Sequence, residues 1–218
     1  KKINWNRQAC KIIMSKIKYV KGRQVFDSRG NPTVEAEIIL ESGLTGTAIV
    51  PSGASTGRYE AHELRDNNKD YLNKSVFNAV NNINNKISKT LINKDSTDQS
   101  EIDKILINLD GTDNKSSIGA NAILAVSIAN LKAASKFENK EIYKFINNKT
   151  NPNFSLPFPL MNIINGGAHA NNSLEIQEFM IRPDGAINFK ECMQMSFLVI
   201  QNLKKNLEDK NISTSVGD

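Results

Sequence analysis

Apolar and polar residues alternate early in the chain, and this pattern predicts strands. In residues 32–40 every second side chain is apolar through most of the run, which is the period of a strand with one buried face. A Glu-Ser-Gly turn signal at 41–43 separates this run from a second apolar run at 44–50. The simplest interpretation of residues 16–50 is therefore a meander of about three antiparallel strands.

After the predicted strands, the spacing of apolar residues becomes helical. Apolar side chains recur at three-, four- and seven-residue steps between Val76 and Leu91, and a second such pattern covers residues 100–109. These spacings are typical of amphipathic helices. Residues 119–137 are rich in Ala and other small side chains, so a helix there can approach its neighbours closely. Together with the strands, these helices predict a compact α+β domain.

The composition changes to Asn, Lys and Pro at residues 147–159, which favours a linker. Two apolar runs of strand length follow at 160–164 and 176–181, and a longer helical pattern covers 189–207. Strand, strand and helix form the expected opening of a second domain. If that domain is an α/β barrel of about 250 residues, this chain holds only its start. The predicted domains are residues 14–150 and 151–218.

The first thirteen residues show neither a helical nor a strand period, whereas a clean pattern begins at Met14. We expect residues 1–13 to be a non-native upstream segment. They carry four positive charges and no acidic residue, and the whole chain has 28 basic and 23 acidic residues. Without them the net charge falls from +5 to about +1, so the basic excess is weak evidence for nucleic-acid binding. We predict no nucleic-acid partner.

Other bulk features favour a cytoplasmic protein. No apolar run is long enough to cross a bilayer, and the polar start does not resemble the apolar core of a signal peptide. The two cysteines, Cys10 and Cys192, are too few for a disulfide framework and fit a reducing compartment. We predict a cytoplasmic location and no membrane partner.

The segment SGASTG at 52–57 is a candidate ligand loop. A nucleotide P-loop needs Gly-Lys followed by Ser or Thr, but Arg58 follows Gly57 here, so the loop is not a P-loop. Small residues and hydroxyl side chains still allow such a loop to fold over an anion or a metal. An ordinary surface turn is the alternative.

A second candidate site joins two short motifs of the predicted second domain. Asn-Gly-Gly-Ala-His at 165–169 follows a predicted strand, and its glycines allow close backbone approach or a positive φ. A structural role for His169 is the alternative. Gln177 and Glu178 lie within an apolar strand pattern, where adjacent side chains point to opposite faces. A carboxylate that faced the apolar side would be costly without a partner, which makes Glu178 a functional candidate.

Five motifs occur together, in this order, in one family of enzymes. They are VFDSRGNPTVE (25–35), VPSGASTGRYEAHELRD (50–66), LDGTDNKSSIGANAILAVS (109–127), PLMNIINGGAHANN (159–172) and IQEFMIRP (176–183). The sequence resembles the N-terminal half of bacterial-type enolases, continuously from about Met14 to Asp218.

The resemblance implies both a fold and a reaction. The implied fold is an α+β N-terminal capping domain, with a three-stranded meander plus helices, followed by the truncated start of an enolase-type α/β (TIM-like) barrel. The first barrel elements of this family break the usual βα alternation. The implied reaction is the magnesium-dependent, reversible dehydration of 2-phosphoglycerate to phosphoenolpyruvate in glycolysis and gluconeogenesis. Two Mg²⁺ ions would stabilise the enediolate intermediate.

The resemblance also implies roles for particular residues. Ser55 matches the loop serine that binds the second Mg²⁺, and Gly53 and Ala54 belong to the same substrate-covering loop. His169 matches the active-site histidine near the phosphate and leaving-group side, and Glu178 matches the carboxylate beside the leaving hydroxyl. A last set comprises the substrate contact Gln177 and the positions Arg23, Arg29 and Glu35, which help form the family's homodimer interface.

The family's general acid, the carboxylates of its first magnesium site and its base lysine match no position up to Asp218. We therefore expect these 218 residues to be a fragment that is inactive alone. One alternative is a non-catalytic interaction module made from the capping domain, against which the intact Ser55, His169 and Glu178 argue. Another is a different reaction of the wider superfamily, but SGASTG and GGAHA favour enolase.

Overall fold

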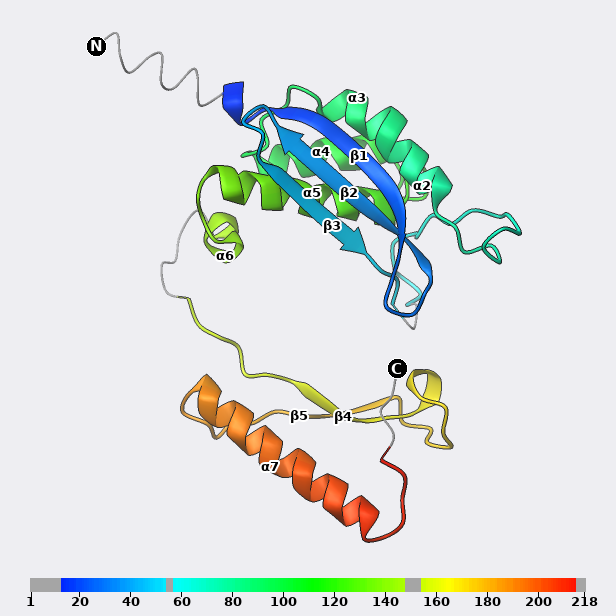
Figure 1. Ribbon diagram of the computed structural model, residues 1–218, viewed down its shortest axis with the longest axis vertical. Coiled ribbons are helices and arrows are strands. Elements are labelled where there is room, and N and C mark those ends of the chain that lie inside the picture. The colour runs from blue at the N-terminus through cyan, green and yellow to red at the C-terminus, as the bar shows by residue number, and fades with distance from the viewer. Residues whose placement is uncertain (1–12, 54–56, 148–153, 215–218) are drawn as a thin grey trace. The chain divides into compact units, whose positions relative to one another are not determined.

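The computed structural model describes residues 13–53, 57–147 and 154–214 (Figure 1). The chain separates into two compact units, Lys1–Thr150 and Asn151–Asp218, and each is described by itself. All but the last residue of the predicted upstream segment 1–13 lies outside the described residues, as do Ala54 and Ser55 of the predicted ligand loop.

The first unit contains the predicted meander. Strands β1 (Ile17–Phe26), β2 (Pro32–Leu40) and β3 (Thr45–Val50) form an antiparallel sheet in the order β1-β2-β3. The alternation seen in the sequence sets the buried face, because Val34, Ala36, Ile38 and Leu40 of β2 are fully buried. The prediction of three antiparallel strands is confirmed.

Helices cover this buried face of the sheet (Figure 1). The helices that contact the strands are α2 (Phe77–Asn82), the π-helical turn η1 (Ile83–Ile87), α3 (Ser88–Leu91) and α5 (Ala120–Phe137). Helices α4 (Gln99–Asp110) and α6 (Ile142–Ile146) pack against α5. The first predicted helix is thus interrupted by a π turn. This turn carries Asn84, whose side chain accepts a hydrogen bond from Gly22 N (2.8 Å) and donates one to Gly22 O (3.2 Å). Asn84 thereby satisfies backbone groups at the edge of β1.

Helix α5 lies close to the sheet because the residues on both surfaces are small where helix and sheet meet. A Cβ on Gly46 of β3 would lie 2.1 Å from the carbonyl oxygen of Ala129 and 2.5 Å from the nitrogen of Ala133. Both alanines are fully buried. The small residues of the predicted 119–137 helix therefore permit a contact between helix backbone and strand.

The N-terminus of α2 is capped by a side chain from a distant loop. The Asp66 carboxylate accepts hydrogen bonds from the backbone nitrogens of Phe77 (2.6 Å) and Asn78 (2.9 Å) and from the Ser75 hydroxyl (2.7 Å). Amides of a first helical turn have no partner within the helix, and a carboxylate there is also favoured by the helix dipole. Asp66 is 5% exposed, so water is largely excluded from its contacts.

The second unit has the predicted strand, strand and helix. Strands β4 (Met161–Asn165) and β5 (Glu178–Ile181) pair antiparallel, the 3₁₀ turn η2 (Gly167–His169) lies between them, and α7 (Phe189–Glu208) follows. The antiparallel pair agrees with the expected break in βα alternation, and the described residues form no closed barrel. Strand β5 begins at Glu178 rather than at 176, because the backbone before it bonds to the glycine turn instead of the strand ladder.

Candidate active site

Three of the predicted site residues meet in the second unit. His169 Nδ1 lies 3.2 Å from Glu178 Oε1, and His169 Nε2 lies 2.8 Å from Gln177 Nε2. The imidazole is therefore held between an amide and a carboxylate, one at each ring nitrogen. These contacts join two motifs that the sequence presents as separate.

The β4–β5 hairpin creates this arrangement. Asn165 at the end of β4 pairs with Glu178 at the start of β5, which fixes the carboxylate beside the turn that carries His169. Gly167 has φ +55° and Gly166 donates its N–H to Gln177 O at 3.1 Å. A Cβ on Gly166 would lie 2.5 Å from Ile176 O. The first glycine allows a close backbone approach and the second a left-handed conformation.

The contacts of the ring define its tautomer. The side-chain nitrogen of Gln177 only donates hydrogen bonds, so the Nε2 atom that faces it accepts. A neutral imidazole in this arrangement carries its proton on Nδ1, which donates to Glu178 Oε1. In this state His169 presents the carboxylate in a fixed orientation, and the pair can hold or relay one proton.

The site is open rather than buried. The His169 side chain is 19% exposed and that of Glu178 is 36% exposed. The neighbouring Phe179 is 54% exposed and Ile176 is 60% exposed. Glu178 is therefore neither buried nor without a partner in the described residues, so the burial cost considered in the sequence argument does not arise here. The hydrogen-bonded histidine is what distinguishes this carboxylate.

Asparagine side chains around the glycine turn were not singled out by the sequence. Asn172 Nδ2 donates to Asn165 O at 3.0 Å, and the Leu174 backbone nitrogen donates to Asn172 Oδ1 at 3.0 Å. The first bond ties the loop after His169 back to β4, and the second is local to that loop. The only sequence signal was the presence of asparagines on both sides of Gly-Gly, which is also typical of ordinary turns.

The predicted ligand loop belongs to the first unit. Gly53 is exposed. The other two predicted residues of the loop, Ala54 and Ser55, lie outside the described residues. The two units are described separately, so the structure does not bring Gly53 to His169. Among the described residues, no three His, Cys, Asp or Glu side chains gather closely enough to hold a metal ion.

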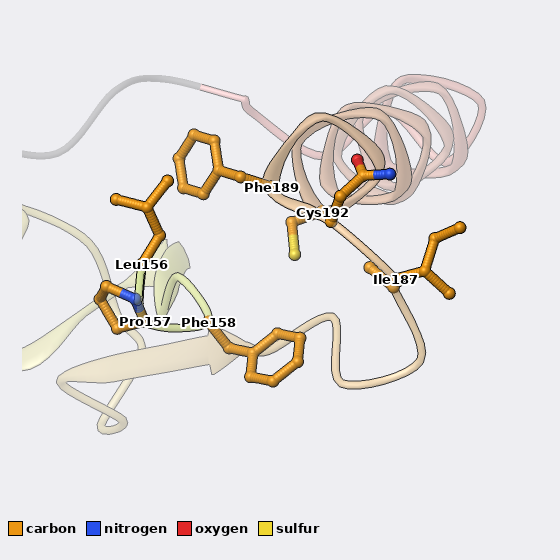
Figure 2. Close-up of a pocket in the computed structure, with 8 residues that line it drawn as sticks. Leu156, Pro157, Phe158, Ile187, Phe189 and Cys192 are labelled. Carbon is orange, nitrogen blue, oxygen red and sulfur yellow. The ribbon is translucent and has the colours of Figure 1, made fainter. Parts of the chain in front are cut away.

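A separate hollow of about 130 Å³ lies beside the start of α7 (Figure 2). The side chains that line it are mostly apolar and none is charged; they belong to Leu156, Pro157, Phe158, Ala186, Ile187, Asn188, Phe189 and Cys192. The Cys192 thiol is buried and its Sγ lies 4.0 Å from Pro183 O. A phosphorylated acid needs cationic or amide partners, so this hollow is suited to apolar packing and not to such a substrate.

Within the three described ranges, none of the helices combines the length and hydrophobicity of a membrane span.

Comparison with known proteins assigns both units to one family. The model of the enolase N-terminal domain matches residues 17–146, and the model of the enolase C-terminal TIM barrel domain matches residues 153–218. The chain is 62% identical over 206 residues to a protein named enolase from Pelagibacter ubique (strain HTCC1062). The match covers 94% of this chain and 49% of that relative, so the chain spans about half the length of the curated relative. Because both domain models and this relative match, the chain belongs to the enolase family.

Proposed function

We propose that this chain carries the N-terminal half of a phosphopyruvate hydratase, a hydro-lyase that converts 2-phosphoglycerate to phosphoenolpyruvate reversibly. The family assignment supports the reaction, and the observation that carries the proposal is the His169–Glu178 contact of 3.2 Å with Gln177 at the opposite ring nitrogen. Loss of a hydroxyl group needs a nearby group that can handle a proton. A carboxylate held by a neutral imidazole fits this requirement.

Each residue then has a role. Glu178 lies beside the leaving hydroxyl, His169 orients Glu178 and contacts the phosphate side of the substrate, and Gln177 contacts the substrate. Ser55 provides a ligand for the second Mg²⁺, with Gly53 and Ala54 in the same substrate-covering loop. When bound, Mg²⁺ stabilises the negative charge that develops on the substrate carboxylate.

The proposal extends to assembly and location. The active protein is a homodimer in the cytoplasm, and Arg23, Arg29 and Glu35 lie at the subunit interface. In the described residues the Arg23 guanidinium bonds to Glu35 (2.7 Å) and Glu37 on the neighbouring strand. Glu37 and then Glu35 raise the pKa of Arg23, and the three side chains form one cluster of charged groups on the sheet.

The test is a chimera in which residues 14–218 are joined to the remaining half of the Pelagibacter enolase. We expect the chimera to form phosphoenolpyruvate, followed by its ultraviolet absorbance, and the 218 residues alone to form none. Glu178→Gln is expected to lower turnover by about 10²–10⁴-fold. Glu175→Gln removes the same charge from an exposed position nearby and is expected to leave turnover unchanged.

Two results would contradict the proposal in different ways. A folded chimera without activity would show that the reaction is wrongly assigned. An active chimera in which Glu178→Gln behaves like Glu175→Gln would show that the reaction is right but that Glu178 does not take part.

A further inference from the structure

Ser52, which directly precedes the SGASTG glycine Gly53, is held by three side chains of the first unit. Its hydroxyl donates to Glu63 Oε1 at 2.5 Å and accepts from Arg65 Nη2 at 2.6 Å. Arg65 Nη2 also lies 2.8 Å from Glu63 Oε1, and Arg29 Nη2 donates to the Ser52 carbonyl at 2.6 Å. Hydroxyl, carboxylate and guanidinium thus form a closed triangle of hydrogen bonds.

The other terminal nitrogen of Arg65 reaches different parts of the same unit. Arg65 Nη1 donates to the carbonyl of Pro32 at 3.1 Å and to the carbonyl of Lys74. One planar guanidinium therefore links the start of β2, the segment just after β3 and the loop before α2. Its fixed fork of donors suits this task, whereas a lysine ammonium provides a single point of contact.

Contacts at the far end of the segment are local. Gly57 N donates to Glu60 Oε2 at 2.7 Å, across three residues. Ser52, in contrast, is bonded to residues 11, 13 and 23 positions away. Ser52, at the start of this segment, is therefore tied to the folded core, whereas the described side-chain bond of Gly57 at its end is to its own turn.

These bonds contribute little to the stability of the unit, because the groups that make them are only partly buried. The Arg65 side chain is 23% exposed and that of Glu63 is 33% exposed, and partly exposed ion pairs contribute little to stability. What the triangle does fix is the position of one backbone segment relative to the sheet. That is the property a functional loop needs from its supporting residues.

We propose that Arg65 is a positioning residue which, together with Glu63, holds Ser52 and so fixes where the segment 53–57 leaves the sheet. This inference rests on the proposed function, because it gives the segment that contains Ser55 its purpose. Arg65 touches neither substrate nor metal in this role and acts through Ser52. It is preferred to Arg29 as a test position, because Arg29 also matches the family's subunit interface.

The first test is hydrogen exchange on the 218-residue chain itself. In Arg65→Ala, peptides that cover residues 50–60 are expected to exchange on the order of tenfold faster, while β2 peptides exchange as in the wild type. Ser52→Ala is expected to reproduce the effect, and it also decides the matter if Arg65→Ala fails to fold. Lys69→Ala removes an exposed cation from the same unit and serves as the matched control.

The second test is kinetic and uses the chimera described above. Arg65→Ala is expected to lower kcat/KM on the order of tenfold at unchanged Tm, and Glu63→Gln, whose amide oxygen still accepts both hydrogen bonds, is expected to retain most activity. Unchanged exchange at 50–60, or faster exchange throughout the unit, would overturn the proposal. If the wild-type chimera is inactive, the proposed reaction is wrong, but the exchange result still decides the role of Arg65.

Discussion

Replacing Asp66 by alanine removes three hydrogen bonds that hold the N-terminus of α2 to a distant loop. The carboxylate accepts from the backbone nitrogens of Phe77 and Asn78 and from the Ser75 hydroxyl, at 2.6 to 2.9 Å. Alanine leaves two helix amides and one buried hydroxyl without this acceptor. Ser75 is fully buried, so water does not readily replace the lost contact.

The magnitude follows from these contacts. A hydrogen bond to a charged group contributes about 1.5–3 kcal/mol, and the contributions of bonds that share one acceptor do not add fully. Because Phe77 is 43% exposed, its amide can recover part of the loss by hydration. We therefore expect Asp66→Ala to lower the free energy of unfolding of the first unit by about 3 kcal/mol. For a unit of this size the corresponding fall in Tm is about 10 °C.

Calorimetry on the 218-residue chain, with the transition of the first unit fitted separately, measures this shift. Asp70→Ala is the control, because Asp70 is an exposed residue of the same loop and its removal changes the net charge equally. A fall in Tm for Asp66→Ala that does not exceed the change for Asp70→Ala would refute the capping argument. It would mean that Asp66 affects the stability of the first unit only through its negative charge.

Three further predictions concern single positions. Gly46→Ala would place a Cβ 2.1 Å from the α5 backbone and is expected to lower the unfolding free energy by about 3 kcal/mol or more, measured by urea denaturation. Gly166→Ala would place a Cβ 2.5 Å from Ile176 O, and NMR of the His169 ring is expected to show loss of its ordered environment. Burial of Asp110 raises the pKa of its carboxyl, but hydrogen bonds from the Thr112 hydroxyl and from backbone amides outweigh this and leave the pKa below its usual value of 3.8. Its stabilising effect is therefore complete above the unfolded pKa and disappears as the pH falls through the lower folded pKa, so denaturation of Asp110→Asn against wild type is expected to show a difference at neutral pH that shrinks in acid.

The elements of the first unit could be predicted because burial follows local periodicity there. Strand β2 alternates in sequence and in burial, with Val34, Ala36 and Ile38 all fully buried. The π turn could not be predicted in this way, because its spacing still resembles that of an α-helix. Its observed feature is the bond between Asn84 and Gly22, 62 residues apart. The cap at Asp66 was missed for the same reason, since it depends on contacts that no local pattern encodes.

The candidate site shows a different limit of the sequence. His169 and Glu178 were found through motifs, but their contact depends on the register that pairs Asn165 with Glu178. A shift of one residue in that register would turn the carboxylate to the other face. The sequence also could not show how far Glu178 is exposed, because periodicity says which residues share a face but not whether that face is covered.

Whether a face is covered matters for the stability of the site in the second unit. Its described residues bury few apolar side chains, with Ala186 and Cys192 among them, while α7 exposes 59% of Phe197 and 51% of Leu198. A two-stranded sheet with one helix gains little stability by itself, whereas a TIM barrel covers both faces of its strands. The glycine turn and the His169 contacts are nevertheless bonded within the hairpin. We therefore expect the hairpin to set the geometry of the site, and the surrounding barrel to provide the stability that catalysis requires.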